Sequence, residues 1–253
     1  MRPEGSHVLH WMVGFRRPRW NFSLEHAAFL ADSLGKPLVV LEALRVGYPW
    51  ASDRLHQFIL DGMRANAGYF KKKNVYYFPY VEAAEGEGRG LLYAFAKDAC
   101  VVVSDDYPTF FIPKMQQAAA SRLEARVELV DSNGLFPMRA TDKVFSRAFD
   151  FRRHLQRELP QYLAEHPLAD PVDGLAPIQK KTREGLKALT GEKWRPASED
   201  VLLGKTLASL PLDHDVPAVD LVGGFEVGEA RVHEFLAGDI DRYGDERSHP
   251  DAD

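Results

Sequence analysis

The sequence predicts an α/β fold in which five parallel strands form one doubly wound sheet. Three observations predict this fold class: five apolar runs of strand length recur before residue 133, helical patterns lie between them, and the runs show little alternation of apolar and polar residues. Runs without alternation are typical of strands that helices cover on both faces. Strands and helices that follow one another in turn favour a parallel sheet with right-handed connections.

A helix is predicted between the first two strands. It begins with Ser23 as its N-cap, because a serine side chain accepts a hydrogen bond from the backbone of the first turn. Gly35 and Pro37 end it, since neither residue favours a further helical turn. The face that we expect to be buried carries Leu24, Ala27, Ala28 and Ala31. The five strands are expected at Val8–Val13, Pro37–Ala43, Val75–Val81, Ala99–Asp105 and Arg126–Ser132.

A second, longer helix follows the second strand. It begins at Ser52 or Asp53, and its apolar residues predict a face that packs on the sheet. The residues expected to be buried on that face are Leu55, Phe58, Ile59 and Met63. Helices over Leu91–Asp98 and Pro113–Leu123 complete the alternation of strands and helices.

The second half of the chain has a different pattern. Basic and aromatic residues at helical spacing predict an amphipathic helix with a basic face over Arg139–Arg157. We expect solvent or an interdomain salt-bridge surface at this face, with phosphate contact as the alternative. Seven of the sixteen prolines lie between Pro160 and Pro217, which predicts a long interdomain connection over a partner domain. Further helices are expected at Gln179–Leu189, Glu199–Leu210 and Glu226–Tyr243.

Composition places the chain among ordinary globular proteins. It has 253 residues, of which 45% are hydrophobic and 27% charged, enough for a sizeable core. The net charge of −5 combines +4 in residues 1–160 with −9 in residues 161–253, so neither part resembles a basic nucleic-acid module. We predict a cytoplasmic protein that does not enter a membrane, because no leader pattern or membrane-length apolar run is present. Cys100 lies in an apolar run and is expected to be buried and inert.

Two loops at the expected carboxyl ends of strands carry candidate ligand-binding residues. The first combines positive charge with an aromatic ring, which suits an anionic or planar ligand. Its residues are Arg16, Arg17, Arg19 and Trp20, and a solvated basic loop is the interpretation that we favour. At the end of the fourth strand, Asp105 and Asp106 could act as acid or base. A turn or helix-capping role is favoured for them.

The glycines of Gly86–Gly90 follow a strand and precede a helix, as phosphate-binding loops do. Their spacing matches neither the dinucleotide fingerprint nor the P-loop, so we expect a plain loop that enters a helix. The sequence also lacks histidine pairs at helical spacing, paired cysteines and the nucleophile elbow of hydrolases. It therefore predicts no metal ligands and no catalytic residues.

Five segments carry a resemblance to a known family. They are HWM with the following Trp20, Asn21 and Leu24, then KPLVVLEAL, DRLHQFILDGM, SDDYPTFFIPKM and VDSNGLFP. Together they cover about half of the chain. They resemble the N-terminal, Rossmann-like antenna domain of the DNA photolyase and cryptochrome family, most closely that of the class II cyclobutane-dimer photolyases.

The last segment, FLAGDIDRYGDERSHPDAD, resembles the opening of the FAD-binding domain in the same family. The tyrosine of that motif contacts FAD and the arginine lies on the DNA-binding side. The resemblance therefore assigns FAD contact to Tyr243 and DNA contact to Arg247. It also implies an antenna domain over residues 1–159, an interdomain linker over 160–222 and the beginning of a helical FAD-binding domain over 223–253.

The resemblance implies light-driven repair of cyclobutane pyrimidine dimers in damaged DNA by a deoxyribodipyrimidine photo-lyase. Reduced FAD, excited directly or through an antenna chromophore, donates an electron to a flipped-out dimer. We expect this chain to be a monomer that alone neither repairs dimers nor retains FAD stoichiometrically. Two alternatives stay open. One is a cryptochrome-like blue-light sensor, which shares this domain. The other is a stand-alone nucleotide-binding α/β protein related to electron-transfer flavoproteins and universal stress proteins, which would need a glycine-rich loop after the fourth strand.

Overall fold

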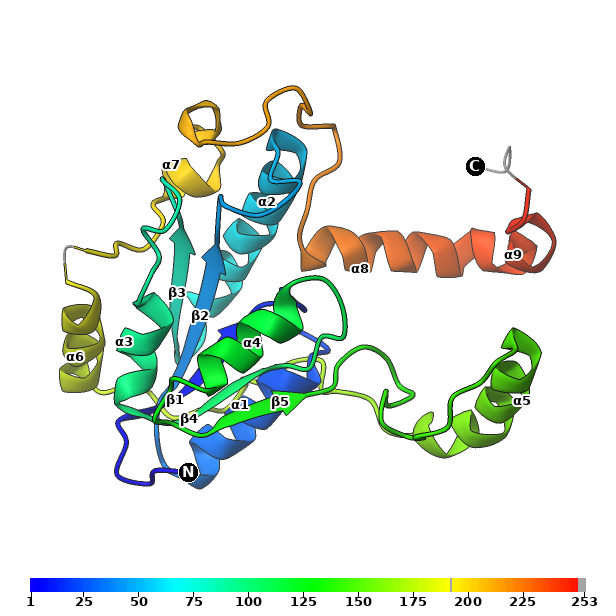
Figure 1. Cartoon of the computed structure of the whole chain (residues 1–253), viewed down its shortest axis with the longest axis horizontal. Coiled ribbons are helices and arrows are strands. Elements are labelled where there is room, and N and C mark those ends of the chain that lie inside the picture. The colour runs from blue at the N-terminus through cyan, green and yellow to red at the C-terminus, as the bar shows by residue number, and fades with distance from the viewer. Residues whose placement is uncertain (192, 250–253) are drawn as a thin grey trace.

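The computed structural model of the chain describes residues 1–191 and 193–249. Its centre is a five-stranded sheet in the order β3-β2-β1-β4-β5, with every neighbouring pair parallel (Figure 1). The strands are β1 (His7–Met12), β2 (Leu38–Leu44), β3 (Val75–Val81), β4 (Ala99–Asp105) and β5 (Val127–Val130). The chain winds outward from β1 to β3 and then continues on the other side of β1. The predicted doubly wound sheet is therefore confirmed.

Helices cover both faces of the sheet (Figure 1). On one face, α1 (Phe22–Ser33) and Phe70 of α2 (Asp53–Phe70) enclose a core with Val8, Met12 and Val40. On the other face, α3 (Leu91–Lys97) and α4 (Ile112–Ala120) pack over the strand side chains that point the opposite way, such as Leu9 of β1 and Leu41 of β2. Every residue of β1 is buried, because this strand lies between β2 and β4 and under helices on both sides.

The helix α1 begins one residue after Asn21, so the prediction of Ser23 as its N-cap was wrong. The Asn21 side chain accepts hydrogen bonds from the backbone N–H groups of Ser23 and Leu24. The Ser23 hydroxyl instead donates to the Asp105 carboxylate at 2.5 Å. The Ser23 hydroxyl is thus bound to Asp105 on β4, and Asn21, two positions earlier, caps the helix. The helix ends as predicted, since Gly35 has a φ of +59°.

The buried face of α2 differs from the predicted one. Leu55 and Phe58 are 41% and 44% exposed, whereas polar His56 and Asn66 are fully buried. The Asn66 amide donates to the carboxylate of Glu42 on β2 at 2.9 Å. The helix turns its polar residues inward because a buried acid on the sheet needs partners, and the apolar pattern gave no sign of this.

The basic segment after β5 is only partly helical. Its helix, α5, covers Ala148–Glu158, and residues 139–147 precede it without helical structure, so the prediction of one helix from Arg139 was wrong. The Thr141 hydroxyl accepts the N–H of Lys143, and Arg147 is extended with φ −128° and ψ 138°. Local side-chain hydrogen bonds of this kind compete with helix formation. The helix α5 projects from the sheet domain (Figure 1).

The proline-rich segment packs against the α/β domain of its own chain. It contains the 3₁₀ turn η1 (Leu159–Tyr162), α6 (Lys180–Thr190), α7 (Glu199–Leu202) and the 3₁₀ turn η2 (Leu207–Ser209). Its buried apolar residues join the cores beneath α1, α3 and α2, and they include Val172, Leu175, Leu186, Trp194 and Leu202. The predicted helix over Glu199–Leu210 is shorter, because Gly204 with a φ of +73° ends it.

The C-terminal helical pattern is confirmed and forms an arm that projects beside α5 (Figure 1). It comprises α8 (Phe225–Glu234), the π-helical turn η3 (Phe235–Asp239) and α9 (Ile240–Glu246). Gly223 and Gly224 join this arm to α2. A Cβ atom at Gly223 would lie 2.0 Å from the Phe58 carbonyl oxygen, so only glycine allows this approach. None of the helices within residues 1–191 and 193–249 is both long and apolar enough to cross a membrane.

Candidate functional site

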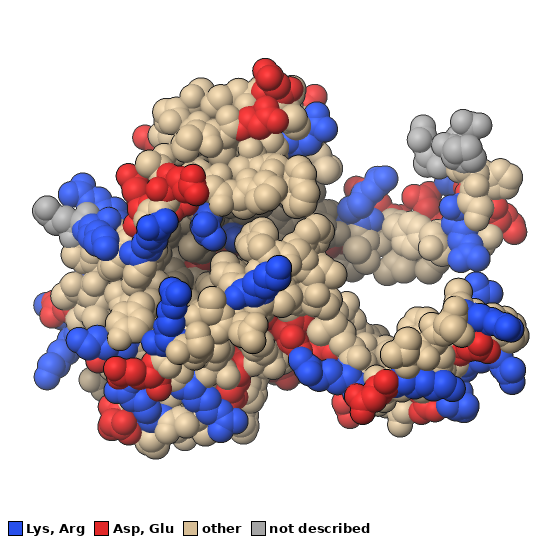
Figure 2. All heavy atoms as spheres, in the orientation of Figure 1, with Lys and Arg blue, Asp and Glu red and all other residues tan. Residues whose placement is uncertain are grey.

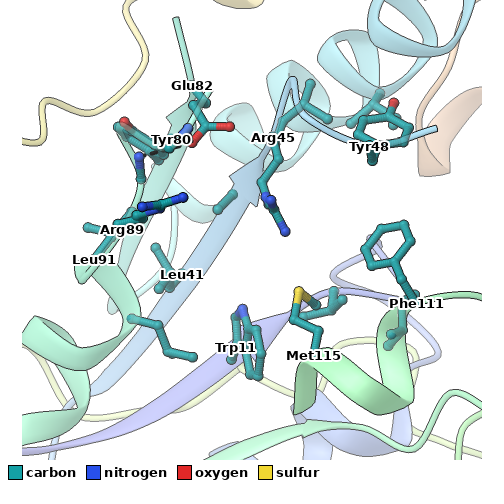
Figure 3. Close-up of a pocket in the computed structure, with 18 of the residues that line it drawn as sticks. Trp11, Leu41, Arg45, Tyr48, Tyr80, Glu82, Arg89, Leu91, Phe111 and Met115 are labelled. Carbon is teal, nitrogen blue, oxygen red and sulfur yellow. Dashed lines mark hydrogen bonds between the residues drawn. The ribbon is translucent and has the colours of Figure 1, made fainter. Parts of the chain in front are cut away.

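A cavity of about 500 Å³ lies at the carboxyl ends of β1, β2 and β3, between α2, α3 and α4 (Figure 3). This edge is where open α/β sheets bind ligands, because the loops that follow the strands converge there. The volume is in the range of sites that enclose a small organic molecule. The cavity is the best-formed candidate site in the described part of the chain.

The walls of the cavity are mainly apolar and aromatic. Trp11 of β1 and Met115 of α4 lie at one end, and Tyr48 and Phe111 stand at one side with ring centroids 6.1 Å apart (Figure 3). Leu41, Leu91 and Tyr80 complete the wall opposite. Flat aromatic side chains on several sides suit a planar ligand, which can stack on them.

Two arginines from different loops extend toward the middle of the cavity (Figure 3). Arg45 follows β2, and Arg89 lies in the loop that follows β3. Both are exposed, and neither guanidinium group makes an ion pair within 4.0 Å with another residue among 1–191 and 193–249. A guanidinium group binds carboxylate or phosphate through two parallel hydrogen bonds. The cavity therefore combines a planar apolar space with positive charge for an anionic group.

A third arginine at the cavity is already paired. The Arg16 guanidinium contacts the fully buried Glu42 carboxylate at 3.3 Å and donates to the Ala43 carbonyl at 2.7 Å. Glu42 also accepts hydrogen bonds from Asn66 at 2.9 Å and from the Tyr77 hydroxyl at 2.6 Å. Burial, together with Glu42, raises the pKa of Tyr77 well above its ordinary value. This network fixes the loop after β1 against the sheet.

The glycine loop binds an acid of the protein itself. Glu82, 2% exposed, accepts the N–H groups of Gly86 and Gly88 on one carboxylate oxygen, at 2.9 and 3.0 Å. Its other oxygen accepts the N–H of Val46 at 3.1 Å. Three backbone amides from two loops thus surround one carboxylate, as they would surround a bound anion. The sequence predicted a loop without a phosphate-binding role here. In the structure, the N–H groups of Gly86 and Gly88 in this loop already bind the Glu82 carboxylate.

Two aromatic residues beside the cavity have left-handed backbone. Trp50 has a φ of 70° and Phe110 a φ of 59°, and their rings meet edge to face with centroids 6.3 Å apart. They are 71% and 69% exposed, and they lie next in sequence to the lining segments of Tyr48 and Phe111. Bulky residues seldom adopt this conformation, which is often found at functional sites. Figure 2 shows the opening as a hollow with basic side chains at its edge.

The basic side chains of the loop after β1 are partly exposed and bind other parts of the protein. Besides Arg16, Arg17 donates to the Trp20 carbonyl, and burial lowers its pKa from the ordinary value. Arg19 and the Trp20 indole N–H both bind the carboxylate of Glu229 on α8, at 2.7 and 3.1 Å. Of this predicted set, only Arg16 lines the cavity.

The remaining sequence candidates have structural roles. The Asp105 carboxylate accepts the N–H groups of Gly14 and Phe15, and Asp106 pairs with Arg139 at 2.9 Å. Both acids thus bind segments far away in the sequence, and the prediction of a local turn or helix-capping role was wrong. Cys100 is fully buried, and burial raises the pKa of its thiol. In the described residues, no group of three or more His, Cys, Asp or Glu side chains is arranged to hold a metal ion.

The basic residues of α5 lie on its projecting arm (Figure 2). They flank a surface hollow lined by Lys143, Phe145, Arg153 and Arg157. Lys143 lies 5.2 Å from the centroid of the Phe145 ring, and Arg153 lies 5.7 Å from that of Phe149. No residue of α5 is buried, so its basic face remains open in the described structure.

Tyr243 and Arg247 lie together at the far end of the C-terminal arm. Tyr243 is 53% exposed, and its ring meets that of Phe235 edge to face at 5.7 Å. The Arg247 guanidinium lies 6.0 Å from the Tyr243 ring centroid. The cavity is formed by other elements, so the structure does not bring these two residues to it.

A curated relative matches 63% of the chain. The deoxyribodipyrimidine photo-lyase of Methanothermobacter thermautotrophicus is 28% identical over 161 residues, which are 63% of this chain and 35% of that protein. This similarity supports the expected resemblance to the N-terminal domain of the photolyase and cryptochrome family. This chain thus spans about a third of the length of that photolyase.

One solved photolyase shares the fold. The crystal structure of a class III photolyase from Agrobacterium tumefaciens superposes with a TM-score of 0.52 at 16% identity, over 92% of this chain and 45% of that one. An archaeal photolyase from Sulfolobus tokodaii superposes with a TM-score of 0.46 at 13% identity, over 59% and 35%. No family model matches the chain. The assignment to class II stays a prediction.

Several residues of the cavity were not predicted from the sequence. Arg45 lies just after a predicted strand and Arg89 lies within the glycine loop, and neither was singled out. Their position after the carboxyl ends of β2 and β3 is the signal that could have identified them. Glu82 directly follows β3 and has the same position, but its burial had no signal, because an acid in a charged loop is usually exposed.

Proposed function

We propose that this chain is the N-terminal part of a DNA photolyase that repairs cyclobutane pyrimidine dimers with light, and that its cavity holds an antenna chromophore. The similarity of the chain to a photolyase supports the first statement. The residues 1–159 then form the antenna domain, 160–222 the linker and 223–253 the start of the FAD-binding part. Cytoplasmic location and a monomeric state remain parts of this proposal.

The observation that carries the antenna role is the aromatic cavity with two unpaired arginines. Trp11, Tyr48 and Phe111 provide flat surfaces for a ring system, and Arg45 and Arg89 provide charge for an anionic group. When bound, such a chromophore absorbs light and passes the excitation energy to the flavin. The protein's part is to hold the ring in one orientation and to keep water away from it.

Tyr243 and Arg247 are proposed to contact FAD and DNA, respectively. A tyrosine hydroxyl can bind phosphate or ribitol, and an arginine pairs with DNA phosphate. Tyr243 is 53% exposed, and its ring meets the Phe235 ring and the Arg247 guanidinium, so no enclosed flavin site forms there. These residues by themselves do not hold FAD, although FAD is the cofactor that the family implies.

Flavin binding tests the antenna proposal. The protein is titrated with FMN, a planar ring system with a phosphate, and the quenching of flavin fluorescence is measured. We expect saturable binding that Arg45→Ala weakens by about tenfold, because one charge-assisted contact is lost. Arg122→Ala removes the same charge from an exposed position outside the cavity and should leave binding unchanged. An unsaturable titration, or equal effects of the two substitutions, would refute the proposal.

A further inference from the structure

The anion cradle at the glycine loop is the part of the cavity that the antenna role does not explain. The carboxyl group of Glu82 fills it, with three backbone amides at 2.9–3.1 Å. Gly86 has a φ of +88°, a left-handed backbone that turns its N–H group toward the same carboxylate as that of Gly88. Glu82, Gly86 and Gly88 all line the cavity, so the cradle forms part of its wall.

The position of the cradle in the cavity wall affects whether the cavity can bind a ligand's phosphate. Backbone amides that converge in this way bind phosphate in many nucleotide-binding loops. Here the protein places its own carboxylate among them, and this carboxylate is 98% shielded from solvent. A ligand phosphate at this point would find no free amide and would lie beside a negative charge.

We propose that Glu82 is a specificity-determining residue, which keeps a ligand's phosphate off the backbone amides of Val46, Gly86 and Gly88. The guanidinium groups of Arg45 and Arg89 are then left as the partners of the ligand's anionic group. The part of the wall formed by Glu82 accepts a neutral edge of the ligand, such as a hydroxyl or ring N–H group. This inference rests on the proposed function only for the identity of the ligand. The cradle itself consists of residues of this chain, whatever the ligand is.

A direct test removes the Glu82 carboxylate and adds inorganic phosphate. Glu82→Ala removes the carboxylate and leaves the three amides facing the cavity. We expect inorganic phosphate, compared with chloride at equal ionic strength, to raise the thermal midpoint of this variant more than that of wild-type protein, in which only the arginines of the cavity are open to phosphate. The variant should bind phosphate at least about tenfold more tightly than the wild type, since each bond to a charged acceptor contributes that much.

Glu85 provides the matched control. It also lines the cavity and carries the same charge, but it is exposed and accepts none of the three amide hydrogen bonds. Glu85→Ala changes the general electrostatics of the cavity by the same amount but opens no amide, so phosphate should stabilise it less than it stabilises Glu82→Ala. Equal phosphate effects in the two variants, or none in either, would overturn the proposal. If Glu82→Ala does not fold, Glu82→Gln removes the charge while keeping one acceptor oxygen, and phosphate should stabilise it more than Glu85→Gln.

A comparison of FMN with riboflavin connects the cradle to the ligand. In Glu82→Ala, affinity for FMN should rise relative to riboflavin by about tenfold, because the phosphate gains a second site. In Glu85→Ala the ratio should stay as in wild type. If neither flavin binds to wild-type protein, the antenna proposal fails while the phosphate test still decides the role of Glu82. If both flavins bind but the ratio is the same in both variants, the cradle does not determine specificity.

Discussion

At the scale of single residues, the two histidines of the central strand are sealed inside the protein. His7 and His10 are both fully buried on β1. Removal from water disfavours the charged imidazolium, and this burial lowers the pKa of each to about 4 from an ordinary 6.5. The folded protein therefore holds both rings neutral, and the stability of the sheet depends on pH.

Stability should fall as the pH falls from about 6.5 to about 4. Over this range the unfolded chain binds protons on both histidines while the folded chain does not, so each residue costs roughly 3 kcal/mol at the lower limit. Urea unfolding at a series of pH values measures this dependence. His10→Leu should make it shallower, whereas His233→Gln, at an exposed position on α8, should not. A pH profile that His10→Leu leaves as steep as before would contradict the account.

At the scale of elements, the proline-rich segment behaves as part of the α/β domain. Trp194 is 8% exposed, and its indole N–H donates to the Glu87 carbonyl at 2.9 Å. Its ring lies over Gly90, where a Cβ atom would be 3.3 Å from it. The segment thus covers the loop that forms one wall of the cavity.

Trp194→Ala should lower the free energy of unfolding by about 3 kcal/mol or more, because a large aromatic side chain leaves the core. Chemical denaturation measures the loss. Trp50→Ala removes the same side chain from a position that is 71% exposed, and it should cost roughly 1 kcal/mol or less. Similar losses in the two variants would show that the segment lies on the domain without supporting it.

The C-terminal arm is anchored at one end only. At its start, Glu229 binds Arg19 and Trp20, and Phe225 meets the Tyr69 ring at 5.8 Å. Beyond Glu234 the apolar residues Leu236, Ile240 and Tyr243 are about half exposed. Helices gain most of their stability from burying an apolar face, so the outer part of the arm is expected to be the least stable part of the chain.

Hydrogen exchange should be fast over residues 235–246, slow in β1 and intermediate in α8. Glu229→Ala removes the anchor and should speed exchange in α8 by about tenfold, because hydrogen bonds to a partly exposed carboxylate are lost. Glu234→Ala is the control, since Glu234 pairs only with Arg231 of its own helix among the described residues. Protection of the whole arm equal to that of β1 would show that a partner covers it.

At the scale of the whole molecule, the cavity and the proposed flavin contact lie in different places. The cavity is enclosed by the sheet domain, and Tyr243 stands on a projecting arm (Figures 1 and 3). A site that retains FAD needs walls around most of the ligand. The described residues supply such walls at the cavity and not at Tyr243.

This chain alone, supplied with FAD, a reductant and light, should leave cyclobutane dimers unrepaired. The physical reason is that electron transfer needs a flavin held beside the lesion, and Tyr243 is 53% exposed. Recovery of thymine absorbance in ultraviolet-irradiated oligothymidylate measures repair, with a complete photolyase as positive control. Recovery above that of a sample without protein would contradict this expectation.

The sequence by itself determined the sheet and its class. Apolar runs such as Val75–Val81 and Ala99–Asp105 became strands with the predicted bounds, because a strand buried on both faces has a purely local signature. The helices α3 and α6 were predicted for a similar reason, since the spacing of apolar residues along a helix is a property of neighbouring residues.

The tertiary structure alone decided which polar groups are buried and where the cavity forms. Glu42 lies inside because Arg16, Asn66 and Tyr77 reach it from three other segments. Of the residues predicted on the buried face of α2, Met63 is buried, whereas Leu55 and Phe58 are exposed. The cavity likewise needs loops that are far apart in sequence. Burial of a charge depends on partners brought by the fold, and no pattern of adjacent residues records those partners.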